Sequence, residues 1–103
     1  MRILRRSKFI DDLTEAYAYL AERSPSAADR LLDDVEAVAD LLAAFPRFGR
    51  PRDELRPGVR SYRLPRFQYI VIYRHEDDTI MFLRLLHGAR DIGTRPDSAV
   101  TNW

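Results

Sequence analysis

The sequence predicts an α+β fold in which a helical hairpin packs on one face of a small, mostly antiparallel sheet. In the first half of the 103-residue chain, apolar residues recur every three or four positions, as on one face of a helix. In the second half, runs of β-branched and aromatic residues predict strands, and Ile3 and Leu4 suggest a further short strand. The predicted order is β-α-α-β-β-β, in one domain over residues 1–91 with a tail over residues 92–103.

The first predicted helix starts near Ser7, which we expect to act as its N-cap. Its apolar face contains residues at helical spacing, namely Ile10, Leu13, Ala16, Tyr17 and Leu20. The short connection over residues 22–24 makes the next helix antiparallel to the first.

The second helix is expected to begin at Ser24-Pro25, a capping residue followed by proline at the first helical position. Pro46 should end it. The apolar residues between these signals also follow a helical period: Ala28, Leu31, Leu32, Val35, Ala39, Leu42 and Phe45.

Residues 46–58 contain three prolines and two glycines and predict an irregular loop. Strands are predicted over residues 59–64, 67–74 and 79–86, with a hairpin turn over residues 75–78.

Side-chain alternation predicts which residues of the last two strands lie beneath the helices. The uniformly apolar sets are expected there: Phe67, Tyr69, Val71 and Tyr73, then Met81, Leu83 and Leu85. The mixed sets should form the second face: Gln68, Ile70, Ile72 and Arg74, then Ile80, Phe82, Arg84 and Leu86. Either a partner or the chain's own tail should cover the apolar part of this face.

Composition excludes several classes of protein. The chain has no cysteine, and its two histidines lack ligand spacing, so we expect no disulfide, no metal site and no cofactor. No apolar run approaches the roughly 20 residues of a membrane span. The basic N-terminus is not followed by the apolar stretch of a secretory signal. A cytoplasmic protein is therefore expected.

The net charge of +1 hides two oppositely charged segments. Residues 11–46 hold nine acids and two arginines, whereas residues 47–74 hold eight arginines and two acids. The basic segment also contains Phe48, Tyr62 and Phe67. It therefore suits nucleic acid, an acidic protein segment or ion pairs with the helical hairpin, and the sequence leaves these three interpretations open.

Several segments together resemble the RelE/ParE superfamily of bacterial toxin–antitoxin toxins, and more closely its ParE branch. The resemblance extends from about Ile3 to Asp91. It is most specific in GRPRDEL (49–55), GVRSY (58–62), YIVIYR (69–74) and IMFLRLLHGARD (80–91), and it includes Ser24-Pro25.

This resemblance implies a toxin that inhibits DNA gyrase and has no active site of its own. It also implies a cognate ParD-like antitoxin, which combines a ribbon-helix-helix DNA-binding dimer with a flexible C-terminal arm that wraps the toxin. Direct DNA binding is expected only through that antitoxin. The residues expected to bind partners are Arg60, Ile70, Ile72, Arg74, Phe82, Arg84 and Arg90.

The alternative is a ribosome-dependent mRNA endoribonuclease, as in the RelE branch. Members of that branch typically carry an arginine where this chain has Ile70, and an apolar side chain cannot neutralise a phosphate. If the chain is a ribonuclease, Glu54, Arg60 and His87 are the candidate catalytic residues.

Overall fold

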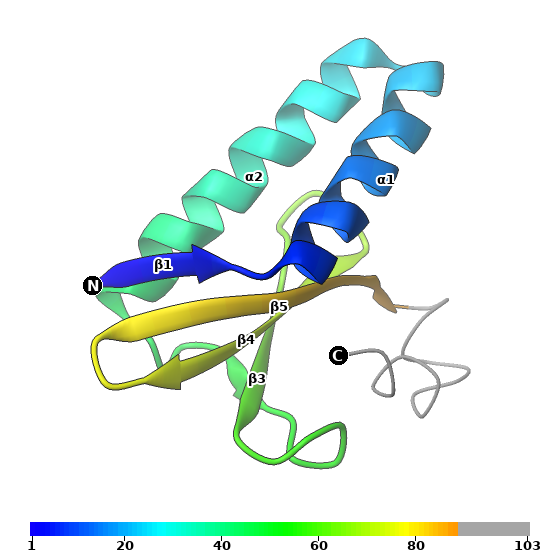
Figure 1. The fold of residues 1–103 in the computed structure, drawn as a ribbon. Helices are drawn as coiled ribbons and strands as arrows, with labels where there is room; N and C mark the ends of the chain where they lie inside the picture. The colour runs from blue at the N-terminus through cyan, green and yellow to red at the C-terminus, as the bar shows by residue number, and fades with distance from the viewer. Residues whose placement is uncertain (89–103) are drawn as a thin grey trace.

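Two antiparallel helices pack on a mixed sheet in the computed structural model, which describes residues 1–88 (Figure 1). The elements follow in the order β1 (Arg2–Arg5), α1 (Ser7–Arg23), α2 (Pro25–Ala44), β2 (Arg50–Pro51), β3 (Val59–Arg63), β4 (Tyr69–Glu76) and β5 (Thr79–His87). The predicted α+β class and element order are confirmed, with the two-residue strand β2 added inside the expected loop. Arg90 and the tail over residues 92–103 lie outside the described residues.

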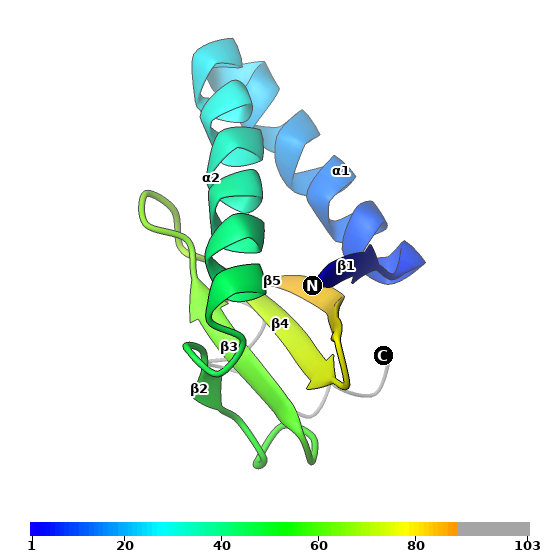
Figure 2. The same ribbon diagram turned by 90° about the vertical axis from the view of Figure 1, so that its left-hand side faces the viewer.

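The five strands form one sheet in the order β1-β5-β4-β3-β2. β1 runs parallel to β5, and every other neighbouring pair is antiparallel. Both helices cover the same face of this sheet (Figures 1 and 2). No helix within residues 1–88 is both long and apolar enough to cross a membrane.

One of the two predicted helix caps is confirmed. The Ser24 hydroxyl accepts a hydrogen bond from the Ala27 N–H (3.3 Å), and Pro25 occupies the first turn of α2. The prediction for Ser7 is wrong, because Arg6 is the N-cap of α1 and makes no capping hydrogen bond through its side chain.

The predicted apolar faces of the helices need three corrections. Ile10, Leu32 and Phe45 are exposed, whereas Phe9 is fully buried at the start of α1. The buried faces point at the sheet and form the main core with Tyr69, Val71 and Tyr73 of β4, as the alternation predicts.

A β-bulge in β5 overturns part of the predicted side-chain alternation. Tyr73 pairs with Phe82, but Ile72 pairs with Arg84, so Leu83 is an extra residue. Before the bulge, Ile80 and Phe82 therefore lie beneath the helices, while Met81 and Leu83 pack on the second face, the reverse of the prediction. After the bulge, the predicted placement holds: Leu85 lies in the main core and Leu86 on the second face.

The second face of the sheet carries a smaller apolar cluster that the chain itself helps to bury. Leu55, from the loop between β2 and β3, packs with Val59, Ile72, Leu83 and Leu86. All five are buried. The apolar centre of this face is therefore not a bare patch.

The turn between β4 and β5 is tighter than predicted. β4 extends to Glu76 and β5 starts at Thr79, which leaves Asp77 and Asp78 as the connection. Asp77 adopts a φ of 53°, a left-handed conformation that aspartate tolerates better than most residues.

Candidate functional site

The outer edge of β5 is only partly covered. β1 pairs with β5 from Thr79 to Phe82, and the Arg6 N–H then donates to the Phe82 carbonyl (3.0 Å) as the chain turns into α1. From Leu83 to His87, no strand of the described chain pairs with this side of β5. A strand edge without a neighbouring strand can pair with an extended peptide.

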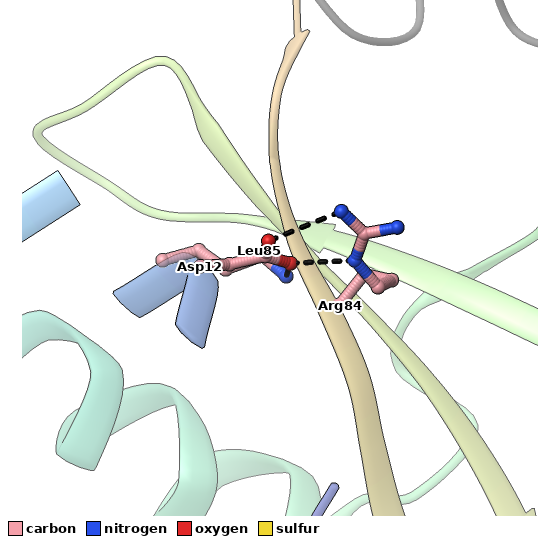
Figure 3. Close-up of polar contacts among 3 residues, drawn as sticks. All are labelled: Asp12, Arg84 and Leu85. Atoms are coloured by element: carbon pink, nitrogen blue, oxygen red, sulfur yellow. Dashed lines mark hydrogen bonds and ion pairs between the residues drawn. The ribbon is translucent and has the colours of Figure 1, made fainter. Parts of the chain in front are cut away.

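Asp12 on α1 reaches this open edge (Figure 3). Its Oδ2 accepts hydrogen bonds from Arg84 Nε (2.6 Å) and from the Leu85 N–H (3.0 Å), and its Oδ1 accepts from Arg84 Nη2 (3.1 Å). The Arg84 and Asp12 side chains are only 15% and 17% exposed, so solvent screens the pair weakly. Asp12 therefore connects α1 to the part of β5 that follows Phe82, where pairing with β1 has ended.

A groove of about 400 Å³ lies beside this contact. It is bounded by α1 on one side and by β5 and the start of β4 on the other, and it is lined by Asp12, Glu15, Ala16, Tyr19, Tyr69, Arg84 and Leu85. The groove combines apolar, aromatic and charged side chains with a strand edge, which suits a peptide segment.

Replacing Asp12 with alanine should lower the free energy of unfolding by about 1.5–3 kcal/mol, because Arg84 and the Leu85 N–H both lose a charged acceptor. Urea denaturation followed by circular dichroism measures this loss. Asp11→Ala is the matched control, since Asp11 is exposed on the same helix. Equal losses in the two variants would contradict the assigned role of Asp12.

Arg60 and Arg74, both expected to bind partners, make contacts inside the chain. Arg60 Nη1 donates to the carbonyls of Gly49 (2.8 Å) and Arg47 (3.1 Å). Arg74 donates through Nη2 to the Pro57 carbonyl (3.1 Å). These two arginines thus hold the connection between α2 and β3 against the sheet.

The three apolar residues expected to bind partners have different environments. Ile70 lies half-buried on the second face. Ile72 lies on that face as predicted, but it is fully buried in the cluster with Leu55. The placement of Phe82 is wrong: the bulge turns it beneath the helices, where it is fully buried against Phe9.

The candidate ribonuclease residues do not converge. Arg60 pairs with Tyr73, and His87 pairs with Tyr69, which lies four residues before Tyr73 on β4. That separation is about 13 Å along the strand. The His87 ring meets the Tyr69 ring edge-on, with 5.4 Å between centroids.

Glu54 is an exposed residue of the loop between β2 and β3. The hydrogen bond from Arg52 Nε (2.6 Å) lowers the pKa of the Glu54 carboxyl group below its ordinary value. A carboxylate held ionised in this way is a poor general acid. No group of three or more potential metal ligands occurs within residues 1–88.

Sequence reasoning missed a polar network beneath the end of α2. The Tyr73 hydroxyl donates to the Pro46 carbonyl (2.8 Å) and accepts from the Gly49 N–H (2.9 Å). Burial raises the pKa of Tyr73, so this hydroxyl keeps its proton at neutral pH. The alternation correctly placed Tyr73 in the core, but nothing in the sequence pointed to partners 24 and 27 residues away.

The fold is shared with a solved structure described as the chromosomal ParDE TA system from P. aeruginosa. The TM-score is 0.72 at 26% sequence identity, and the match covers 84% of this chain and 95% of that chain. The hairpin on a five-stranded sheet therefore places the protein in the class of toxin–antitoxin toxins with this fold.

Sequence comparisons identify the family within that class. The model of the ParE toxin of type II toxin–antitoxin systems, parDE, matches residues 3–92. Toxin ParE3 of Caulobacter vibrioides is 32% identical over 95 residues, covering 91% of this chain and 93% of that protein. Toxin ParE2 of Mycobacterium tuberculosis is 37% identical over 79 residues, covering 76% and 72%. The chain belongs to the ParE toxin family and is the toxin component of a type II toxin–antitoxin system.

Proposed function

We propose that this toxin inhibits DNA gyrase by stabilising the complex in which gyrase has cleaved DNA. Membership of the ParE family carries the proposal. The separation of Arg60 from His87 along β4 supports it, because two of the three candidate ribonuclease residues lie apart. A toxin of this kind needs only a surface that binds one state of gyrase more tightly than the others. It would act in the cytoplasm, without catalysing a reaction of its own.

We further propose that a cognate ParD-like antitoxin neutralises this toxin, and that its flexible C-terminal arm folds on the toxin surface. We propose that this arm binds in the groove beside α1 and β5, because no described strand pairs with the edge of β5 from Leu83 to His87. Asp12 already binds the Leu85 N–H, so the arm would pair with other backbone groups of this edge. Arg84 is the proposed side-chain contact in the groove, and Ile70, half-buried on the second face of the sheet, is a proposed contact outside it. Arg60 and Arg74 would contribute indirectly, by holding the loops near the sheet.

A plasmid assay with purified gyrase tests the target. Adding the full-length toxin to gyrase, ATP and relaxed plasmid should inhibit supercoiling and leave linear DNA after the proteins are denatured and digested. An equimolar amount of the cognate antitoxin should restore supercoiling, which controls for contaminating nuclease. Unchanged supercoiling and no cleavage at saturating toxin would contradict the proposal.

The ribonuclease alternative is tested separately, with message translated in a reconstituted system. Primer extension should give full-length products in the presence of toxin. Toxin-dependent cuts at ribosomal A sites would assign the protein the RelE-like activity instead.

A further inference from the structure

Three aromatic rings form a row where α2 ends beside β3, and two of them, Phe45 and Phe48, are exposed while Tyr62 is half-buried. Phe45 and Phe48 are 58% and 60% exposed, more than the other large apolar side chains of the described chain. The Phe48 ring centroid lies 6.1 Å from that of Phe45 and 5.9 Å from that of Tyr62. We call Phe45, Phe48 and Tyr62 the aromatic row. Adjoining exposed rings on a small domain mark a binding surface.

The backbone that carries the aromatic row is held firmly. The Phe48 N–H donates to the Phe45 carbonyl (3.0 Å), which forms a turn directly after the helix. The Tyr73 hydroxyl binds the Pro46 carbonyl and the Gly49 N–H, and the Arg60 guanidinium binds the carbonyls of Arg47 and Gly49. Side chains presented on a fixed backbone lose less conformational entropy when they bind a ligand. The buried network thus preorganises two rings that point away from the core.

The aromatic row lies within a basic part of the sequence. Residues 41–75 contain eight arginines and only two acids, Asp53 and Glu54. Both acids are engaged locally: Asp53 accepts from the Gly58 N–H (3.0 Å), and Glu54 pairs with Arg52. Arg47, next in sequence to Phe48, is exposed and has no ion pair within the described part of the chain.

We propose that the aromatic row and the adjacent Arg47 bind single-stranded DNA. Bases would stack on the Phe45 and Phe48 rings, while Arg47 neutralises a phosphate. The combination of adjoining exposed rings and a cation without a carboxylate partner matches the repeating base-and-phosphate chemistry of a single strand. This goes beyond inhibition of gyrase, since the toxin would contact DNA directly. The choice of DNA rather than RNA rests on the proposed gyrase target.

The helical hairpin is acidic, and its charge would repel DNA phosphates. The last acid of α2 is Asp40, and no acid occurs from Leu41 to Arg52. The aromatic row therefore begins beyond the acidic part of the helix, and Arg47 belongs to the basic segment of the chain.

Fluorescence anisotropy of a labelled oligo-dT of about 12 nucleotides tests the proposal with the full-length toxin alone, at about 50 mM salt. The toxin should bind this strand more tightly than a duplex of equal length. The double variant Phe45→Ala/Phe48→Ala should weaken binding by about tenfold or more. Leu32→Ala, which removes an exposed apolar side chain from α2, should leave binding unchanged.

A pair of charge reversals tests the phosphate contact. Arg47→Glu should weaken binding and flatten its dependence on salt, whereas Arg30→Glu, the same change on the exposed face of α2, should do so much less. Circular dichroism checks that each variant is folded.

Four results would overturn the proposal: no binding of oligo-dT, equal binding of duplex, tighter binding of oligo-U, or equal losses in the variants and their controls. A double variant that binds oligo-dT normally but no longer inhibits gyrase would assign the aromatic row to a protein contact instead. Because the oligonucleotide assay contains no gyrase, its failure is distinguishable from failure of the gyrase proposal.

Discussion

Replacing Phe82 with alanine is expected to lower the free energy of unfolding by about 3–5 kcal/mol. The Phe82 ring is fully buried beneath the helical hairpin, with its centroid 5.2 Å from that of Phe9. Removing the ring loses its transfer free energy and leaves a cavity, because the sheet and helices relax only partly into the space. Urea denaturation followed by far-ultraviolet circular dichroism measures the effect.

Ile70→Ala is the comparison variant, since Ile70 is a half-buried apolar residue on the opposite face of the sheet. It should cost clearly less than Phe82→Ala because much of its surface already contacts solvent. If Phe82→Ala instead kept full stability and weakened binding of the antitoxin, Phe82 would be a partner contact and not a core residue.

The misplacement of Phe82 shows where sequence alternation stops being informative. β4 follows Gln68 and ends in Arg74, His75 and Glu76, and its core-facing residues Tyr69, Val71 and Tyr73 were predicted correctly. Residues 80–86 of β5 are apolar except for Arg84, so both faces look alike and neither parity is excluded. When both faces of a strand are apolar, the local sequence does not reveal that the strand contains a bulge.

The helical hairpin was largely predictable because its signals are local. Ser24-Pro25 and Pro46 mark the bounds of α2 within a few neighbouring residues. The role of Asp12 could not be predicted in this way. Its position near the start of α1 suggests only a favourable interaction with the helix dipole. In the structure it accepts hydrogen bonds from Arg84 and Leu85, which lie 72 and 73 positions later in the sequence. Only the folded arrangement of α1 and β5 brings these groups together.

Gly49→Ala is expected to destabilise the protein by about 3 kcal/mol or more. A Cβ atom at this position would lie 2.4 Å from the Tyr73 hydroxyl oxygen, 2.6 Å from a carbon of its ring and 2.9 Å from the Ser61 carbonyl oxygen. The Ser61 carbonyl belongs to the backbone of β3, which is paired with β4, and the Tyr73 ring is fully buried. Neither group can therefore move aside without a large cost in free energy. Chemical denaturation gives the loss directly.

Gly58→Ala is the matched control, because the same substitution there acts by a different cause. Gly58 has a φ of 82°, and its added Cβ would meet only Arg74 Nε, at 3.9 Å. Its cost should be the roughly 1–2 kcal/mol of a left-handed alanine. A larger loss at Gly58 than at Gly49 would contradict the steric argument.

The clash at Gly49 and the hydrogen bond of Tyr73 are one interaction, so their substitutions should not add. Tyr73→Phe alone leaves the Gly49 N–H and the Pro46 carbonyl without a partner, at about 1–3 kcal/mol. In Gly49→Ala/Tyr73→Phe, the closest contact disappears with the hydroxyl, and the double variant should lose less than the sum of the single losses. Because this network also carries Phe48, Gly49→Ala should weaken oligo-dT binding even under conditions where the variant stays folded. Full additivity, or unchanged oligo-dT binding by folded Gly49→Ala, would mean that the network and the aromatic row are independent.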